Sequence, residues 1–555
     1  MLNANKKQVL NGICDNSGSN ILMLLAKGES RSNLVKLIKS KIDSENKKDK
    51  ILQNLIFSIN FDDSDIIIKK IINDNLCDIN LQNKYGETAL MLACVYDNEK
   101  CFKLLLMEIN SCDVNLKDNA GNNVLMLASM RKSKYIKLLM ENKLCDINLQ
   151  NNEGFTALML ASTHHDVLCA KLLMENKLCD MNLQNNDGNT ALIIGSIYCH
   201  NEIVISLIEN KCDINIKNNK GETALMHANK STIKLFTEND MCDLNAQDNN
   251  GNTILMKIIF ATMRLSKLYQ YEQINDYMYI FDTVASKKSY CINIQNNAGE
   301  TILMVIIKNK NIIGHSYFSY YKNTIIIHHR YNYNYNLLDN EKATVLSHLL
   351  MFHHLSHLLC DMNSFIKKTI ELTHNVHTQD IYGTTPLMRA ILTKKNVSIV
   401  QKIIDISINN KIIFDLQDNY GETALIHAIQ NKKFTIAKIL INNGCNINIE
   451  NNGNKTAFWY SIQKESLVIT NMFIDLYIER KDMSFLEYQE EILILLNSGT
   501  GMLKDKMRRT FKKRIINLYE IEFTQIINMQ NHVFSQCYKN LGDLNTITMI
   551  IQYLI

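Results

Sequence analysis

The stretch Lys143–Ala161, KLCDINLQNNEGFTALMLA, contains the features that recur along this chain. Asn151 stands three residues before Gly154, and Thr156 stands two residues after it. An Asn side chain can accept hydrogen bonds from the backbone of a β-turn, and glycine readily adopts the positive φ that closes one. Threonine is a favourable helix N-cap, and the apolar run ALMLA follows it directly. The stretch therefore predicts a β-turn that leads into a short helix.

The pattern returns with a period close to 33 residues. The first six turn glycines follow one another at steps of 35, 33, 34, 33 and 30 residues. The turn glycines are Gly86, Gly121, Gly154, Gly188, Gly221, Gly251, Gly299, Gly383, Gly421 and Gly453, the last with one residue inserted before Thr456. A second stretch with one apolar stripe, such as DVLCAKLLMEN, follows the first helix. Self-similarity at this period predicts a solenoid of helix-turn-helix units.

The units resemble ankyrin repeats, whose pattern runs G-x-T-P-L-H-x-A, then a second helix, then G-A-D-x-N. The chain's one proline, Pro386, lies in GTTPLMRA at the family's proline position, and Gly444 and Cys445 lie on its G-A pair. Residues such as Met91 and Met159 replace the family's His, so we expect a family hydrogen bond to be missing and methionine packing to replace it. The resemblance implies an all-α ankyrin-repeat solenoid of about 13 helix-turn-helix units with β-turn tips, followed by a C-terminal helical segment.

The predicted domain organisation has three parts. They are an N-terminal leader, the ankyrin-repeat solenoid and a helical C-terminal segment or cap, over residues 1–14, 15–475 and 476–555. Degraded repeats are expected near residues 45–75 and 310–375, the second with the copy DNEKATVLSHLL at Asp339–Leu350. An aromatic insertion spans residues 308–338. We interpret it as a tolerated loop, with a recognition loop as the alternative.

Six units carry a Cys-Asp-x-Asn tetrapeptide before the turn, and its thiols need an explanation. The cysteines are Cys77, Cys112, Cys145, Cys179, Cys212 and Cys242. Packed helices lie about 10 Å apart, whereas a disulfide needs Cα atoms within about 7 Å of each other. We therefore expect these cysteines to act as small buried apolar residues rather than as disulfides or a metal ladder.

The sequence contains no convincing metal or catalytic site. His353, His357 and Cys360 could share one helix face and supply zinc ligands, but a fourth ligand is not evident, and the segment aligns with a degraded repeat. We interpret these three residues as structural. The chain has no HExxH motif and no G-x-S-x-G motif. The prediction is a non-enzymatic protein with no cofactor, no metal ligand and no catalytic residue.

Composition limits the partners and the compartment. The formal net charge of +4 over 555 residues gives no argument for nucleic acid or an anionic membrane. The chain has no run of about 18 apolar residues, and its first residues lack the apolar core of a secretory signal. We expect a monomer with neither a membrane nor a nucleic-acid partner. The expected location is a reducing intracellular compartment. We expect the cytoplasm, which could be that of a host cell, and the nucleus is the alternative.

The predicted function is that of a protein–protein interaction scaffold. Stacked repeats place the turn tips and the exposed side of the first helices on one concave face. The residues expected to contact a protein partner are Lys84, Tyr85, Glu87, Asn152, Glu153, Phe155, Asn186, Asp187, Asn189, Lys220, Glu222, Tyr382, Tyr420 and Glu422. Aromatic residues among them are plausible anchors because aromatics supply much of the energy of interfaces.

Two further resemblances bear on the partner. The C-terminal LGDLNTITMIIQYLI is similar to the F-box-like segment of poxviral ankyrin proteins at Leu541, Ile550, Tyr553 and Leu554, although the Pro and Glu of that segment are absent. This similarity implies an alternative function, a substrate adaptor for a cullin-type ubiquitin ligase. The CDIN and TALM variants, with abundant Asn, Ile and Lys, resemble the ankyrin-repeat proteins of mimivirus-type giant viruses. That resemblance implies a host protein as the partner.

Overall fold

The computed structural model describes most of the predicted solenoid. The described residues are 14–30, 32–37, 68–69, 71, 77–107, 112–130, 132–141, 145–268, 270–309, 333–351, 360–373, 376–393, 397–409, 414–480, 509 and 513. Most of the degraded repeat near 45–75, residues 310–332 of the insertion, His353, His357 and nearly all of the tail lie outside them, so their predictions stay predictions. Contacts divide the chain into two units, residues 1–297 with 311–328 and residues 298–310 with 329–555.

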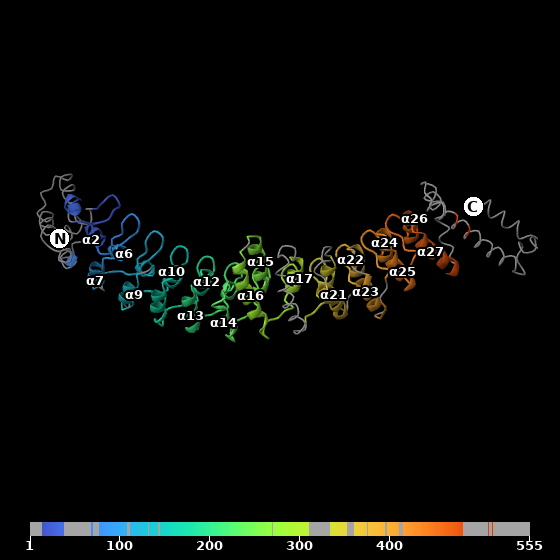
Figure 1. The fold of residues 1–555 in the computed structure, drawn as a ribbon. Helices are drawn as coiled ribbons and strands as arrows, with labels where there is room; N and C mark the ends of the chain where they lie inside the picture. Colours follow the sequence, from blue (N-terminus) through green and yellow to red (C-terminus); the bar gives the residue numbers. More distant parts are fainter. Residues whose placement is uncertain are drawn as a thin grey trace, which may run out of the picture. The chain divides into compact units, whose positions relative to one another are not determined.

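The first unit is a stack of helical pairs, and the turns before its first helices project from one side of the stack (Figure 1). Its described helices are α2 (Ile21–Ala26), α6 (Ala89–Val95), α7 (Glu99–Met107), α8 (Val124–Ala128), α9 (Ser133–Met140), α10 (Ala157–Thr163), α11 (Val167–Met174), α12 (Ala191–Ile197), α13 (Asn201–Glu209), the 3₁₀-helix η1 (Ala224–His227), α14 (Ile233–Thr237), α15 (Ile254–Lys267) and α16 (Tyr271–Ala285). First helices contact first helices, as α10 does with α8 and α12.

The second unit repeats this organisation. Its described helices are α17 (Ile302–Lys308), α20 (Val345–Leu350), α21 (Cys360–Leu372), α22 (Pro386–Leu392), α23 (Val397–Asn409), α24 (Ala424–Gln430), α25 (Phe434–Asn442), α26 (Ala457–Gln463) and α27 (Leu467–Arg480). The first helix α24 contacts α22 and α26 on either side, and its second helix α25 contacts α23 and α27. The described part of the chain has only isolated β-bridges and no strand. None of its helices has the length and apolar character needed to cross a membrane.

The turn before each first helix forms as the sequence predicts. Asn151 Oδ1 accepts hydrogen bonds from the backbone N–H groups of Glu153 and Phe155, at 3.0 and 2.8 Å. Gly121 closes the preceding turn at φ +83°, and a Cβ there would lie 2.5 Å from the Asn152 backbone nitrogen. Glycine is therefore required both by its φ and by the close approach of the next turn.

Two turns close without glycine. Lys342 has φ +57° in the degraded copy Asp339–Leu350, and Asn454 has φ +53° where we expected Gly453. The Asn454 N–H donates to the Asn451 carbonyl at 2.9 Å, which is the bond that closes the turn. The prediction of an inserted residue before Thr456 was therefore wrong. Asn454 occupies the glycine position, because Asn also tolerates left-handed backbone, and the unit has its ordinary length.

The helix N-caps also correct one expectation. Thr156 Oγ1 accepts from the Met159 N–H at 3.3 Å, as an N-cap should. The Met159 sulfur in turn accepts from the Thr156 N–H at 3.5 Å, and Met91 and Met388 do the same at 3.4 Å. The expected loss of a hydrogen bond was wrong in these three repeats, because the thioether sulfur is itself a weak acceptor.

Asparagine side chains connect successive repeats. Asn148, the last residue of a Cys-Asp-x-Asn tetrapeptide, accepts from the Asp180 N–H of the next repeat at 2.8 Å. At the turn tips the Asn152 side chain donates to the Asn119 carbonyl, and the Asn186 side chain donates to the Asn152 carbonyl, both at 2.9 Å. These amides satisfy backbone groups that the turns would otherwise leave unpaired. The abundance of Asn therefore has a structural role in this fold.

The tetrapeptide cysteines pack in the joints between repeats. Cys77, Cys112 and Cys212 are buried, and Cys145, Cys179 and Cys242 are partly buried. Burial raises the pKa of Cys112 and Cys212 to about 12. A thiol with such a pKa stays protonated at neutral pH and is a poor nucleophile and metal ligand. The geometry supports the packing interpretation of these residues.

Candidate partner-binding surface

The turn tips present the residues that we predict to contact a partner. Lys84, Tyr85, Asn152, Glu153, Asn186, Asp187, Lys220, Tyr382 and Tyr420 are exposed, whereas Glu87, Phe155, Asn189, Glu222 and Glu422 are partly buried. The aromatic rings are the largest apolar groups among them. Tyr85, Tyr382 and Tyr420 are 53%, 59% and 74% exposed, and the Lys84 ammonium lies 5.2 Å from the Tyr85 ring centroid.

Several predicted contact residues already have partners within the repeat stack. The carboxamides of Asn152 and Asn186 belong to the inter-repeat bonds described above. Asn189 Oδ1 accepts from the Asn218 side chain at 2.9 Å, and Glu87 Oε2 accepts from the Asn83 side chain at 2.8 Å. These polar groups fix the positions of the tips. The exposed tyrosine rings are therefore better suited to contact another protein than the asparagines are.

A second set of exposed apolar residues, which was not predicted from the sequence, lies at the ends of the first helices. Val95 and Tyr96 end α6, and Ile197 and Tyr198 end α12, at seven and eight residues after the N-cap threonine. Their side chains are 41–56% exposed. The sequence does contain a signal for these residues. Counting from the N-cap threonines of α6 and α12 places large apolar residues beyond the buried part of both helices.

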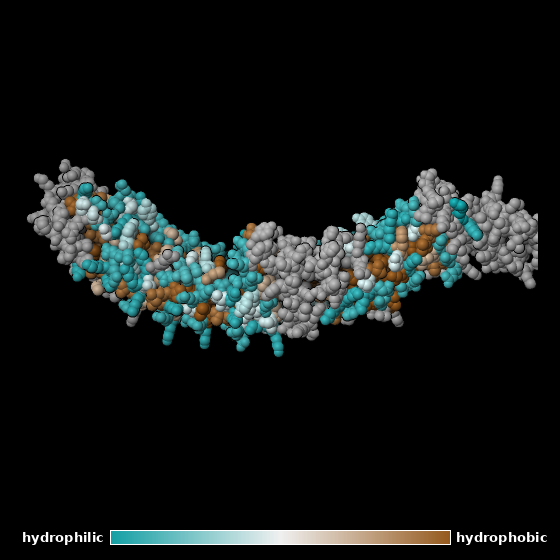
Figure 2. All heavy atoms as spheres, in the orientation of Figure 1, coloured by the Kyte–Doolittle hydropathy of each residue, from teal (hydrophilic) through white to brown (hydrophobic). Residues whose placement is uncertain are grey.

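The end of α12 is linked to the preceding repeat by stacked rings. Tyr198 and His200 are stacked with centroids 5.8 Å apart, and His200 and His165 are stacked at 4.5 Å. His200 is fixed by a 2.6 Å hydrogen bond between its Nδ1 and the Ser162 carbonyl of the preceding repeat. Tyr198, His200 and His165 thus form a row of rings that crosses from one repeat to the next. Figure 2 shows apolar side chains set among hydrophilic ones on the visible face.

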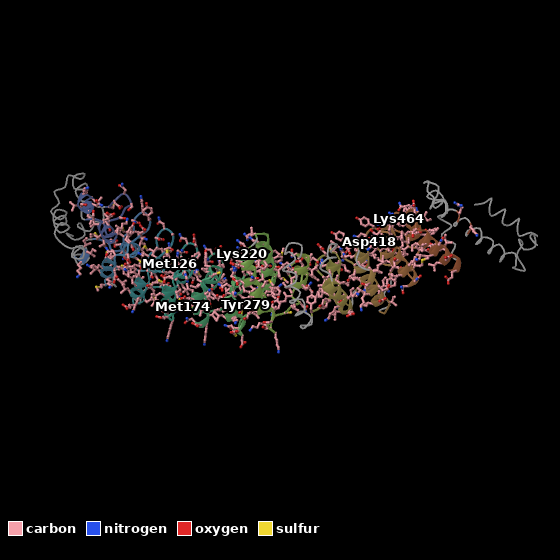
Figure 3. The ribbon with its side chains drawn as sticks, in the orientation of Figure 1. Met126, Met174, Lys220, Tyr279, Asp418 and Lys464 are labelled. Atoms are coloured by element: carbon pink, nitrogen blue, oxygen red, sulfur yellow. The ribbon has the colours of Figure 1, made fainter. Side chains whose placement is uncertain are left out.

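A cavity of about 570 Å³ lies beside Ile197 in the first unit. The 30-residue step between Gly221 and Gly251 shortens this repeat. Its first helix is the four-residue η1, and its second, α14, has five residues, whereas α16 of the next repeat has 15. Met226, Tyr277 and Ile280 are among the lining residues. Figure 3 labels Lys220, at the turn of the short repeat, and Tyr279 on α16.

In three later repeats, a basic side chain that pairs with an aspartate stands at the fourth residue after the N-cap. Leu92 and Leu160 occupy this position in early repeats, whereas His348, Arg389 and His427 occupy it later. His348 Nε2 lies 2.7 Å from Asp339 Oδ2, and both side chains are almost completely buried. Burial acts to raise the pKa of Asp339, but hydrogen bonds from His348 and the Ala343 N–H outweigh it and lower the pKa to about 2.

A similar cluster joins the last repeats of the first unit. Glu222 forms an ion pair with Lys257 of the following repeat, and His227 Nε2 lies 3.1 Å from Glu222 Oε2. Burial raises the pKa of Glu222, but the hydrogen bond and the charge of Lys257 outweigh it and lower the pKa to about 2. Glu222 is therefore ionised at neutral pH and bound within the stack, which makes it a weak candidate for partner contact.

Comparisons with known proteins match parts of this chain to ankyrin repeats. A family model described as ankyrin repeats in three copies matches residues 55–151, 125–218 and 395–482. One similar solved structure is the ankyrin repeat domain of Bcl-3, a member of the IkappaB family, with 24% identity, coverage of 40% of this chain and 94% of that chain, and a TM-score of 0.34. Another is EF0377, an ankyrin repeat protein, with 27% identity, coverage of 31% and 87%, and a TM-score of 0.27. A search of curated proteins found no match.

The family match and the described turns and helices together define the class of protein. The ankyrin-repeat resemblance is confirmed for the matched segments, and the described chain is an all-α ankyrin-repeat solenoid. Ankyrin repeats are generally protein–protein interaction modules and are generally not enzymes.

Proposed function

We propose that this chain is a non-enzymatic scaffold that binds a protein partner on the turn tips and the first-helix ends. The observation that carries the proposal is the exposure of Val95, Tyr96, Ile197 and Tyr198 at equivalent positions of two repeats. The neighbouring cavity lined by Met226 and other residues offers a recess for a partner side chain. A partner that covers these side chains would remove their apolar area from water, which favours binding.

The test starts with partner capture by the full-length chain and identification by mass spectrometry. The binding affinity of the captured protein is then measured for the wild type and for Tyr96→Ala/Tyr198→Ala. We expect at least about tenfold weaker binding, because truncating an interface aromatic commonly costs more than 1 kcal/mol. A matched control is Leu168→Ala/Met241→Ala, whose side chains are 57% and 77% exposed but lie outside the first helices. Equal loss in the control, or no loss in the test variant, would contradict the proposal.

The tip residues are tested in the same assay. Tyr85→Ala/Phe155→Ala/Tyr420→Ala removes three predicted aromatic contacts while leaving the turn-closing glycines and the Asn ladder in place. Weaker partner binding with an unchanged helical CD signal would add the tips to the surface. Unchanged binding would restrict the surface to the helix ends.

We also propose that the partner is a host protein, on the sequence resemblance to giant-virus ankyrin proteins alone. The ubiquitin-ligase adaptor alternative depends on residues 476–555, which lie almost entirely outside the described residues. It stays a prediction, and co-purification of ligase subunits that is lost on deleting this segment would support it.

A further inference from the structure

Several buried or partly buried carboxylates beside the first helices have a lysine or arginine partner. Three clusters in the described chain show this: Glu222 with Lys257, Glu300 and Asp339 with Lys308, and Asp380 with Arg389. A permanent cation compensates for the cost of holding ionised carboxylates away from water. These three clusters can be compared with the cluster of Asp418, Glu422 and His427, whose carboxylates pair with a histidine instead.

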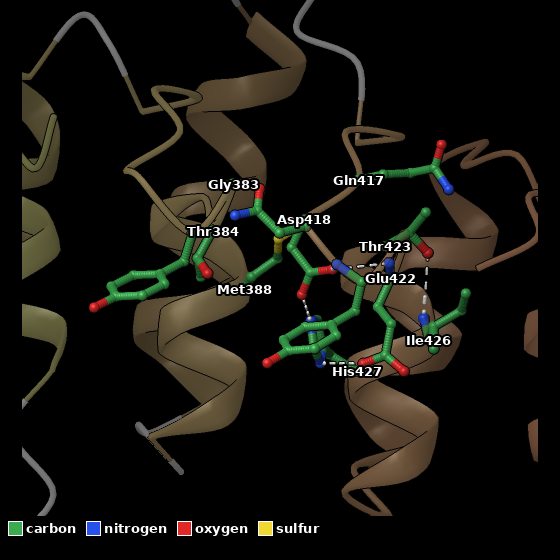
Figure 4. A network of polar contacts seen from close by, with 12 residues as sticks. Gly383, Thr384, Met388, Gln417, Asp418, Glu422, Thr423, Ile426 and His427 are labelled. Atoms are coloured by element: carbon green, nitrogen blue, oxygen red, sulfur yellow. Dashed lines mark hydrogen bonds and ion pairs between the residues drawn. The ribbon is translucent and has the colours of Figure 1, made fainter. Parts of the chain in front are cut away.

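The cluster of Asp418, Glu422 and His427 departs from this arrangement. Asp418 and Glu422 lie in the turn before α24, and His427 lies on α24, with its ring between the two carboxylates (Figure 4). The side chains are 5%, 15% and 7% exposed, respectively. Among the ion pairs of the described residues, neither carboxylate has a lysine or arginine. One buried and one partly buried carboxylate therefore share one imidazole.

The missing cation can be traced to one residue. Lys257, which pairs with Glu222, is the fourth residue after the N-cap of the following repeat. The equivalent residue after Glu422 is Tyr460, whose hydroxyl accepts a 2.9 Å hydrogen bond from the Asn451 side chain. The tyrosine thus takes the place of the lysine without supplying a charge.

The His427 ring is oriented with one nitrogen available. Nε2 lies 2.8 Å from Asp418 Oδ2, and a carboxylate acceptor places the hydrogen on Nε2 in the neutral ring. Nδ1 is buried and makes no hydrogen bond. It lies 3.4 Å from Glu422 Oε2, while Glu422 Oε1 accepts from the Gln430 side chain at 2.5 Å. A buried lone pair and a carboxylate oxygen therefore face each other.

We propose that His427 Nδ1 and Glu422 Oε2 bind a divalent transition-metal ion such as Zn²⁺. Two zinc ligands at about 2.0–2.2 Å from the metal and at a tetrahedral angle lie about 3.3–3.6 Å apart, which matches their separation of 3.4 Å. Asp418 holds the ring through Nε2, an arrangement that is common behind metal-bound histidines. Candidate ligand atoms of all three residues lie within 4.8 Å of one another. The site is independent of the proposed partner binding.

The test is a zinc titration of the metal-free, full-length protein against a chromophoric chelator, with Co²⁺ absorption as a second readout. His427→Gln removes the nitrogen ligand. Tyr460→Lys leaves all three cluster residues intact but places an ammonium where Lys257 stands beside Glu222. His227→Gln is the matched control, because this histidine lies in the cluster that already contains Lys257.

We expect the wild type and His227→Gln to bind one more zinc equivalent than His427→Gln and Tyr460→Lys, with thermal melts showing that all four proteins are folded. Zinc should also raise the melting temperature of the wild type but not of Tyr460→Lys, because a ligand that binds only the folded state stabilises it. Equal zinc binding by the wild type and His427→Gln would overturn the proposal.

Discussion

The repeats that begin at Asn83, Asp118, Asn151 and Asn185 are here called the apolar repeats. Those that begin at Asp339, Asp380 and Asp418 are called the ion-paired repeats, because each aspartate lies beside a basic side chain of its own first helix. Both sets form the same turn. Asn151 Oδ1 accepts two backbone N–H groups at 3.0 and 2.8 Å, and Asp418 Oδ1 accepts two at 2.9 Å. The turn needs only one acceptor oxygen at this position, so the other side-chain atom is free to vary.

The second polar atom of this side chain has a different partner in the two sets of repeats. The Asn151 amide nitrogen donates to Asn122 Oδ1 in the preceding repeat at 2.9 Å. Asp418 Oδ2 instead binds His427 within its own repeat. The Asn151 amide therefore contributes to cohesion between repeats, whereas Asp339, Asp380 and Asp418 each fix their turn to their own first helix. The second arrangement places ionised groups in the core, which makes it sensitive to the loss of either partner.

The largest expected effect is that of Asp380→Ala in an ion-paired repeat. It leaves the Arg389 guanidinium without its carboxylate and removes the acceptor of the Tyr382 and Thr384 N–H groups. We expect a loss of about 3–5 kcal/mol in local stability, against about 1–2 kcal/mol for Asn151→Ala in an apolar repeat, where only hydrogen bonds are lost. Native-state hydrogen exchange of the α22 and α10 amides measures both. Equal losses would remove the energetic distinction between the two sets.

A smaller effect is expected when an ion pair is transplanted into an apolar repeat. Leu160→His alone places a polar ring at a position that is 8% exposed, and should cost about 2–3 kcal/mol. Adding Asn151→Asp supplies the carboxylate found at Asp418, and should recover about 1 kcal/mol. A double-mutant cycle on the α10 amides gives the coupling. Additive effects of the two substitutions would show that the histidine and the aspartate do not interact at these positions, so that further residues are needed to form the pair.

The pH dependence of folding stability should also differ between the apolar and the ion-paired repeats, by about 2 kcal/mol. The pKa of Asp339 is lowered to about 2 in the folded chain from an ordinary 3.8. Its contribution to stability, about 2 kcal/mol, is therefore present above pH 4 and is lost as the pH falls from about 4 to about 2. The amide of Asn151 does not titrate. Hydrogen exchange should show the α20 amides losing protection in this window, and Asp339→Asn should abolish the response. An unchanged response in that variant would assign it to other carboxylates.

Features that depend on short stretches of sequence could be predicted. Gly154 and Thr156 lie within a few residues of the groups that they contact, so the turn, the N-cap and the start of α10 followed from local preferences. The position of Asn454 did not, because Asn and Gly both tolerate positive φ and adjacent copies of the two leave the register ambiguous.

The candidate surfaces were harder to predict for a different reason. The exposure of Tyr198 depends on where α12 ends and on its stacking with His200. The Asp418, Glu422 and His427 cluster spans ten residues and meets only after the turn folds back onto α24. The reduced length of η1 and α14 follows from a three-residue shortening of the repeat period, which is visible in the sequence. The cavity beside η1 could not be predicted, because it also depends on the long helix α16 of the next repeat.

The most direct test of the central claim is hydrogen exchange of the full-length chain with and without the captured partner. The account predicts protection at the ends of α6 and α12, around Tyr96 and Tyr198, and in the residues lining the cavity beside η1. It predicts little change in the second helices α7, α11 and α13. Protection confined to these second helices, with the first-helix ends unaffected, would contradict it.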